Sequence, residues 1–296
     1  MPRRSKSFKI ALRWLILAAV VFFLLQSLQK HWQDVTKLRI DAAGVACLAI
    51  ALGVTLFAHI FAGYVWSWIL QFLSYRVSGA WGAQTYLKTN IAKYLPGNVW
   101  HFYGRINAAK QVGIPIAPAT LSILLESLLT AAAACVFAFV GHRSRAWLQL
   151  AIVLLILIAI HPLFLNRVLK QASKLKQSTD PIHLERYPLL PLLGELGFLG
   201  LRSIGFVLTF LALRPISISE LPLLVSGFAW AWLLGFIIPG LPGGVGVFEA
   251  IALALLSQAF PSGQVLAAAV LYRFVNTLAE GMGAGFATID DRHSSG

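Results

Sequence analysis

Residues 42–73 read AAGVACLAIALGVTLFAHIFAGYVWSWILQFL, an apolar run without a lysine, arginine, aspartate or glutamate. A helix needs roughly 17–25 predominantly apolar residues to cross the hydrocarbon core of a bilayer. This run exceeds that length, so it predicts a membrane-spanning helix that is long enough to tilt. The fold is therefore expected to be that of a membrane protein.

The composition of the whole chain agrees with this prediction. Of the 296 residues, 58% are apolar and only 12% are charged, about half the charged fraction of an ordinary soluble domain. Lysine and arginine together number 24 against 11 acidic residues, a formal net charge of +13. High hydrophobicity excludes disorder, and the lack of an otherwise polar surface argues against nucleic-acid binding. We expect a single integral membrane domain over residues 1–296.

Further apolar runs on both sides of this segment predict additional spans. The first follows a basic N-terminus and lacks a signal-peptidase site, so it is interpreted as an uncleaved helix. The expected fold class is all-α, a polytopic bundle of transmembrane helices. Its spans cover about 10–28, 42–73, 117–140, 146–165, 188–213, 220–238 and 264–288.

Two segments are too interrupted to cross the membrane as straight helices. Residues 80–112 carry several basic side chains and are broken at Pro96-Gly97, and residues 239–259 begin with PGLPGGVGV. Proline and repeated glycine interrupt a helix. Each segment is therefore predicted to be re-entrant, meaning that it enters the membrane and returns to the same side.

The distribution of basic residues predicts an orientation. With the N-terminus inside the cell and 80–112 returning to that side, most lysines and arginines lie in the cytoplasm, as the positive-inside rule requires. We expect a multi-pass protein of the inner (cytoplasmic) membrane with both termini cytoplasmic. The two broken segments, each followed by a span with a glutamate, then form an inverted repeat, which points to a transport site. The alternative is that Pro-Gly pairs recur by chance in loops.

The first broken segment contains the motif KYLPGNVW, residues 93–100, followed by Arg105. Backbone groups freed at such a break must be buried or line a polar cavity. Lys93 and Arg105 would attract an anionic headgroup, and Tyr94 and Trp100 suit the level of lipid headgroups. The alternative is a basic interfacial anchor that binds nothing specific.

The second broken segment contains PGLPGGVG, residues 239–246, followed by Glu249. It lacks the Gly-Lys-Ser/Thr of a phosphate-binding loop. Its break is expected to end at a helix N-terminus, where free amide groups and a partial positive charge favour an anion. The alternative is a tight turn with a carboxylate at the start of a helix.

Charged residues also occur within or beside the expected spans, where each would cost roughly 2.5–3.5 kcal/mol at the bilayer centre. Glu195 and Arg202 are seven positions apart, as are Arg273 and Glu280. These spacings predict neutralising pairs on one helix face, and the alternative roles are proton relay or substrate contact. No histidine or cysteine spacing indicates a metal site.

The two motifs together, KYLPGNVW with Arg105 and ILLE at 123–126, and PGLPGGVGVFE at 239–249, resemble the lysylphosphatidylglycerol synthase transmembrane, or flippase-like, family. The resemblance covers about residues 8–290. It implies a helical bundle with re-entrant segments that is associated with moving a lipid between leaflets. The chain is identified as a stand-alone member without the cytosolic synthase domain, so aminoacyl transfer is not expected.

The expected function is that of a lipid flippase or transporter that moves an anionic or headgroup-modified lipid between leaflets. The expected partners are membrane lipids, above all an anionic phospholipid, with no nucleic acid, metal or cofactor and no enzymatic activity. One alternative is an accessory membrane subunit of a glycosyl- or aminoacyl-transferase. Another is a membrane-embedded enzyme with a glutamate as general base. The candidate substrate-binding and translocation residues are Lys93, Tyr94, Pro96, Gly97, Asn98, Trp100, Arg105, Glu126, Pro239, Gly240, Pro242, Gly243, Gly244, Gly246, Glu249, Arg273 and Glu280.

Overall fold

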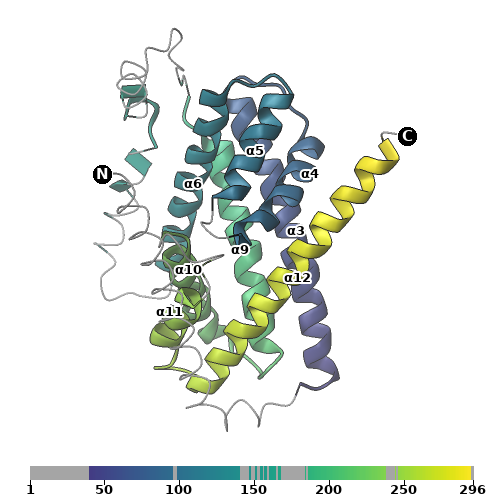
Figure 1. The fold of residues 1–296 in the computed structure, drawn as a ribbon. Helices are drawn as coiled ribbons and strands as arrows, with labels where there is room; N and C mark the ends of the chain where they lie inside the picture. The colour runs from purple at the N-terminus through teal and green to yellow at the C-terminus, as the bar shows by residue number, and fades with distance from the viewer. Residues whose placement is uncertain are drawn as a thin grey trace, which may run out of the picture.

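A computed structural model describes most of the chain and shows only helices and their connections there (Figure 1). The all-α class expected from the sequence is confirmed. The described residues are 40–95, 99–140, 147, 151, 154–155, 157–158, 160–164, 166–167, 184, 186–237, 244 and 246–294.

Five helical segments in the described part of the chain are long and apolar enough to cross a membrane. They make the protein a multi-pass membrane protein. The span expected at 10–28 and part of the one at 146–165 lie outside the described residues. The five are α3 (Ala42–Phe72), α6 (Ile116–Ala138), α9 (Leu189–Leu211), the segment Ile218–Ile237 that contains α10 (Leu221–Ile237), and Ser262–Asp290 within α12 (Ser262–Ser294).

Local sequence explains where the spanning helices begin and end. The side chain of Asp41 accepts a hydrogen bond from the backbone N–H of Gly44 at 2.7 Å and caps the start of α3, as short acidic side chains do at helix N-termini. The helix stops before Ser74, whose φ of 71° is left-handed. Helix α6 starts directly after Pro115, which lacks the N–H that a helix interior needs.

Both segments predicted to be broken are interrupted. The first consists of α4 (Gly79–Asn90), a short 3-10 helix η1 (Ile91–Tyr94) and α5 (Trp100–Gln111), and the second joins α10 to α11 (Val247–Leu256). Helices α4 and α5 lie toward one end of the bundle and α10 and α11 toward the other (Figure 1). Re-entry through one membrane face and the inverted repeat stay predictions.

A close backbone contact holds the first broken segment against α3. A Cβ atom added to Gly63 would lie 2.4 Å from the Cα of Ala83, and one added to Gly82 would lie 2.6 Å from the carbonyl oxygen of Gly63. Small residues allow such backbone approach between membrane helices. The position of α4 beside α3 therefore depends on these glycines.

An aromatic cluster packs the other end of the bundle. The rings of Phe206, Phe228, Phe248 and Tyr272 come from α9, α10, α11 and α12, with centroids 5.4–5.9 Å apart. Such aromatic pairs contribute about 0.5–1.5 kcal/mol each beyond the area they bury. The cluster fixes α11 and the residues near the second break.

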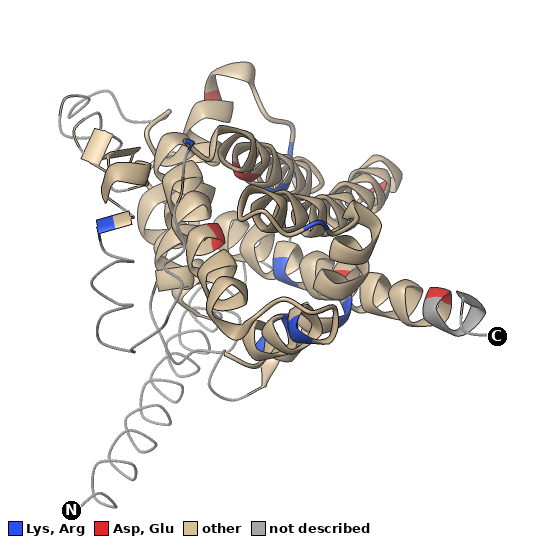
Figure 2. Ribbon diagram, turned by 90° about the horizontal axis from the view of Figure 1, so that it is seen from above, with Lys and Arg blue, Asp and Glu red and all other residues tan. Residues whose placement is uncertain are grey.

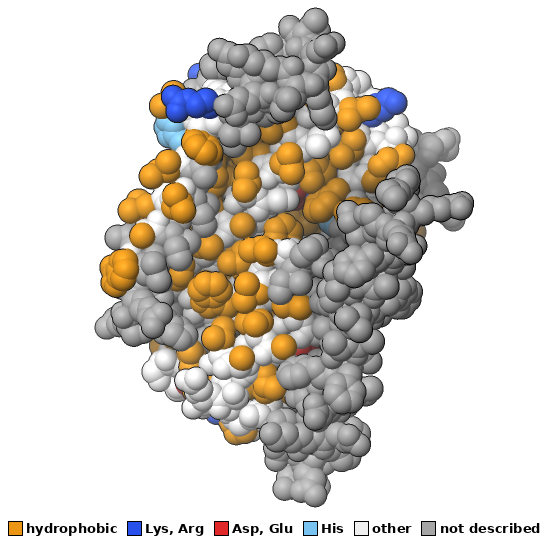
Figure 3. Space-filling model, turned by 60° about the vertical axis from the view of Figure 1, so that its left-hand side comes forward, with side chains coloured by type: hydrophobic (Ala, Val, Ile, Leu, Met, Phe, Trp, Pro, Cys, Tyr) orange, Lys and Arg blue, Asp and Glu red, His pale blue; other side chains and the backbone are white. Residues whose placement is uncertain are grey.

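Charge and hydrophobicity are separated between the interior and the outside of the bundle. Several acidic and basic positions lie among the packed helices when the bundle is viewed from above (Figure 2). Hydrophobic side chains spread over the side of the molecule, where acidic groups are visible only in recesses (Figure 3). This arrangement places a polar interior inside a surface suited to lipid.

Candidate functional site

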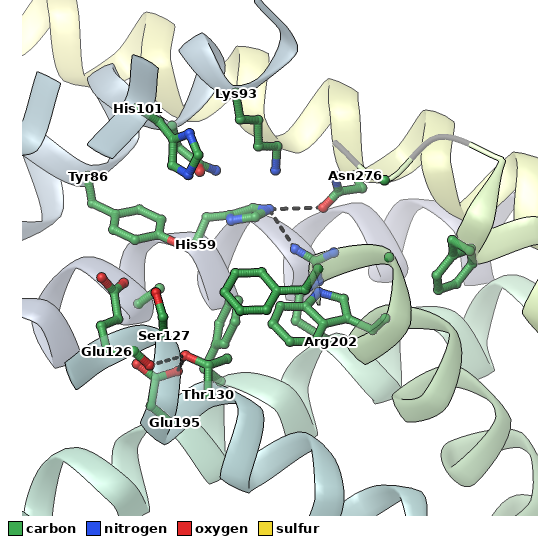
Figure 4. Close-up of a pocket in the computed structure, with 18 of the residues that line it drawn as sticks. His59, Tyr86, Lys93, His101, Glu126, Ser127, Thr130, Glu195, Arg202 and Asn276 are labelled. Carbon is green, nitrogen blue, oxygen red and sulfur yellow. Dashed lines mark hydrogen bonds between the residues drawn. The ribbon is translucent and has the colours of Figure 1, made fainter. Parts of the chain in front are cut away.

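A cavity of about 370 Å³ lies between the helices and is lined by both broken segments and all the described spans (Figure 4). Its lining residues His59, Glu126 and Arg202 lie near the middle of α3, α6 and α9. The polar and charged lining residues are His59, Tyr86, Asn90, Lys93, His101, Arg105, Glu126, Ser127, Thr130, Glu195, Arg202, Tyr272, Arg273 and Asn276.

Arg105 and Glu126 form a buried ion pair between α5 and α6. Nη1 of Arg105 lies 2.8 Å from Oε1 and 2.5 Å from Oε2 of Glu126. The guanidinium also packs against the rings of Trp66, Tyr86 and Phe102, 4.9–5.6 Å from their centroids. Its remaining N–H groups have no partner among the described residues. Arg105 is therefore held in place with hydrogen-bond donors left for a ligand.

Lys93 in η1 is paired with Glu280 in α12. Its Nζ lies 2.5 Å from Oε1 of Glu280, and the same oxygen accepts a hydrogen bond from Nδ2 of Asn276 at 2.9 Å and lies 3.1 Å from Nε2 of His59. Burial lowers the pKa of the Lys93 ammonium, although the Glu280 carboxylate acts in the opposite direction. This network fastens the first break to the last helix.

Glu249 and Arg273 fasten the second break in a similar way. Oε2 of Glu249 accepts a hydrogen bond from the N–H of Gly246 at 2.7 Å, and Oε1 lies 3.1 Å from Nε of Arg273. Arg273 also donates to the carbonyl of Gly244. Gly244 and Gly246 both have positive φ, 67° and 84°, a conformation that favours glycine. Glu249 thus lies in the first turn of α11, where both interpretations of this motif place it, and its role in substrate binding stays a prediction.

Arg202 and Glu195 have no partner of opposite charge within 4 Å among the described residues. Arg202 donates from Nε to the hydroxyl of Tyr272 at 2.6 Å, and its Nη1 lies 3.2 Å from Nε2 of His59. Glu195 accepts a hydrogen bond from the hydroxyl of Thr130 at 2.8 Å. Both side chains are buried.

The pairs predicted from spacing, Glu195 with Arg202 and Arg273 with Glu280, are therefore wrong. Seven residues along a helix correspond to about 10.5 Å, which is too far for direct contact between these side chains. Charged groups in this bundle instead contact partners on other helices, because the interior of the bundle brings those helices closer together.

His101 is a buried histidine at the side of the cavity next to Arg105. Burial lowers the pKa of its imidazole to about 3, and the positive charges of Arg105 and Lys93 act in the same direction. Its Nδ1 atom has no hydrogen-bond partner in the described part of the chain. His101 is therefore neutral at physiological pH.

The structure brings part of the predicted site together. Lys93, Arg105, Glu126, Gly244 and Arg273 line the cavity, and Gly246, Glu249 and Glu280 bind lining residues or each other as described above. Seven predicted residues lie outside the described part: Pro96, Gly97, Asn98, Pro239, Gly240, Pro242 and Gly243.

Two predicted residues lie away from the cavity. The hydroxyl of Tyr94 is 3.1 Å from that of Thr277, on the side of η1 that does not line the cavity. Trp100 is 48% exposed and meets the edge of the Tyr103 ring. Neither residue lines the cavity, and the position at the level of lipid headgroups that was expected for both stays a prediction.

Sequence reasoning missed several lining residues. His59, Tyr86, Tyr272 and Asn276 were absent from the predicted site, and Glu195 and Arg202 appeared only as a neutralising pair. The available signal was a polar side chain in the middle of an apolar span, which is expensive unless it faces a cavity or a partner. His59 and Asn276 carry that signal.

Comparison with known proteins agrees with the resemblance noted from the motifs. The chain matches the family model described as the lysylphosphatidylglycerol synthase TM region over residues 10–279. None of the curated proteins compared matches it. Because the match covers most of the chain, the protein belongs to this family, and it is an integral membrane protein of lipid metabolism.

Proposed function

We propose that this member of the lysylphosphatidylglycerol synthase transmembrane family moves an anionic or headgroup-modified phospholipid between the leaflets of the cytoplasmic membrane. The observation that carries the proposal is Arg202, a buried cation in the cavity whose partners among the described residues are the neutral hydroxyl of Tyr272 and His59. A buried charge without a counter-ion is strongly unfavourable. Glu280 lies behind His59 and is already paired with Lys93, so a lipid phosphate in the cavity would supply the directly bound counter-ion of Arg202.

Arg105 supports the same assignment. Its guanidinium is fixed by Glu126 and three aromatic rings, and its remaining N–H groups are available toward the cavity. Guanidinium groups bind phosphate oxygens through paired hydrogen bonds. Arg105 and Arg202 thus offer two fixed cationic groups in one cavity, while the acyl chains stay in the lipid beside the apolar outer surface (Figure 3).

The two breaks suit a path through the middle of the bundle. Val99, next to the first break, and Gly244, within the second, both line the cavity. Broken helices that meet at a central site are a recurring feature of transporters. In the proposed cycle, each broken segment in turn opens the cavity to its own side of the membrane.

The test uses the purified protein in liposomes that contain fluorescent phosphatidylglycerol. Translocation is followed by the fraction of label accessible to a membrane-impermeant quencher. We expect Arg202→Gln to lower the rate at least about tenfold, equivalent to about 1.4 kcal/mol. The matched control is Arg214→Gln, because Arg214 lies at the end of α9 outside the cavity and pairs with Glu220.

Two results would overturn the proposal. One is translocation by the wild-type protein that is no faster than in empty liposomes. The other is an Arg202→Gln variant that inserts and folds correctly and still translocates the lipid at the wild-type rate.

A further inference from the structure

We infer that Glu195 binds a proton when the cavity takes up an anionic headgroup, so that one proton accompanies each lipid. This inference rests on the proposed function and adds the driving ion. Its starting point is that the cavity contains a buried carboxyl group that has no cationic partner in the part of the chain that the structure describes.

Four carboxyl groups of the described residues lie in or beside the cavity, and three of them have a cationic partner. Glu126 binds Arg105, Glu249 binds Arg273 and Glu280 binds Lys93. Glu195 is the exception among the described residues, although its side chain is only 2% exposed. Its hydrogen-bond partner is the hydroxyl of Thr130.

The groups around Glu195 do not replace the missing cation. Glu126 lies on the neighbouring helix, so two carboxyl groups share the single positive charge of Arg105, which contacts Glu126 directly. Like charges that share a site oppose ionisation of both. The other charged and titratable groups lining the cavity are His59 on α3, Tyr86 on α4, Lys93 on η1, His101 on α5, Arg202 on α9 itself, and Tyr272 and Arg273 on α12.

The hydrogen bonds near Thr130 allow Glu195 to be either protonated or ionised. The Thr130 hydroxyl lies 2.7 Å from the carbonyl oxygen of Glu126 and 2.8 Å from Oε2 of Glu195, but a hydroxyl has only one hydrogen to donate. If Glu195 carries a proton, it donates to Thr130, which donates in turn to the carbonyl. If Glu195 is ionised, it receives a single hydrogen bond and the carbonyl loses one.

The cationic groups of the cavity, Arg202 among them, couple proton binding by Glu195 to binding of the lipid phosphate. When Glu195 is protonated, the described cations in and beside the cavity, Lys93, Arg105, Arg202 and Arg273, outnumber the carboxylates of Glu126, Glu249 and Glu280, and this net positive charge attracts an anionic phosphate. When Glu195 releases its proton, its carboxylate offsets that charge and repels the phosphate. Binding of the proton and binding of the headgroup therefore favour each other, and this coupling is reciprocal.

The experiment measures binding of short-chain phosphatidylglycerol to the purified full chain from mildly acidic to mildly alkaline pH. For one coupled proton, wild-type affinity should fall as pH rises, by up to about tenfold per pH unit. Glu195→Gln stays neutral, so its affinity should match that of the wild type at acidic pH and stay constant. The matched control Glu220→Gln, outside the cavity, should keep the wild-type dependence.

A second measurement does not depend on the affinity of the variant. Infrared difference spectra of the wild type on lipid addition should show the carbonyl band of a newly protonated carboxylic acid, and Glu195→Gln should lack it. Wild-type affinity that is constant with pH would overturn the inference and leave the proposed function standing. A Glu195→Gln variant that keeps the pH dependence or the carbonyl band of the wild type would overturn the inference in the same way. Absence of wild-type binding at every pH would overturn both.

Discussion

The ammonium group of Lys93 lies 2.5 Å from the carboxylate of Glu280, although the two residues are 187 positions apart. The contact joins the first broken segment to the middle of α12. Glu280 is almost fully buried, and its Oε1 also contacts His59 and Asn276. One carboxylate thus organises three elements next to the cavity.

Removing the charge of Glu280 should destabilise the protein. Glu280→Gln leaves the Lys93 ammonium next to a neutral amide, and loss of one partner of a buried pair costs about 3–5 kcal/mol. Unfolding in detergent, followed by tryptophan fluorescence, measures the change. Asp290→Asn is the control, because Asp290 lies at the exposed end of the same helix and binds Gln84. The double variant Lys93→Met with Glu280→Gln should regain most of the lost free energy of unfolding. A Glu280→Gln variant as stable as the wild type would contradict the prediction.

The role of Arg105 depends on its geometry as well as its charge. Arg105→Lys keeps a cation beside Glu126 but loses the planar group that contacts three rings and has N–H donors left over. We expect affinity for phosphatidylglycerol to fall about tenfold, since lysine and arginine are not interchangeable at phosphate sites. Equilibrium binding to the purified protein measures it, with Arg214→Lys as the matched control. Unchanged affinity in Arg105→Lys would show that charge alone suffices.

Tyr272 is predicted to hold the guanidinium of Arg202 in place. Tyr272→Phe removes the hydroxyl that accepts a 2.6 Å hydrogen bond from Nε of Arg202 and leaves the aromatic ring. A buried charged donor without its acceptor should lower the free energy of unfolding by about 1–3 kcal/mol. The control Tyr103→Phe alters a ring that is 65% exposed and should change stability by less than about 0.5 kcal/mol. Equal stabilities of the two variants would contradict the prediction.

The spanning helices could be predicted because the signal is local. A run such as 42–73 is apolar over a sufficient length regardless of its neighbours, and α3 covers Ala42–Phe72. The breaks could also be predicted, because proline and glycine act on the backbone where they stand.

The partners of the charged residues could not be predicted in the same way. Spacing suggested Glu195 with Arg202, but α9 presents Arg202 to Tyr272 on α12 and Glu195 to Thr130 on α6. Those contacts depend on how distant helices pack, which a single sequence does not state. The cost of burying a charge nevertheless marked both residues as ones that needed an explanation.

The contact between α3 and α4 provides the last prediction. In Gly63→Ala, the new Cβ would lie 2.4 Å from Cα and 2.9 Å from N of Ala83. These are backbone atoms, so a change of rotamer cannot relieve the clash and α4 must move away from α3. Overpacking of this kind costs about 1–3 kcal/mol, and the shift should also weaken phosphatidylglycerol binding because α4 carries Tyr86 beside Arg105.

Gly53→Ala is the matched control in the same helix, because a Cβ there meets nothing within 4 Å. Replacing glycine by alanine in a helix interior without a clash is neutral or stabilising by up to about 1 kcal/mol. The two variants add the same methyl group to the same helix, so a difference in unfolding midpoint isolates the contact with α4. If both variants unfold at the same denaturant concentration, α3 and α4 do not pack as closely as the structure describes.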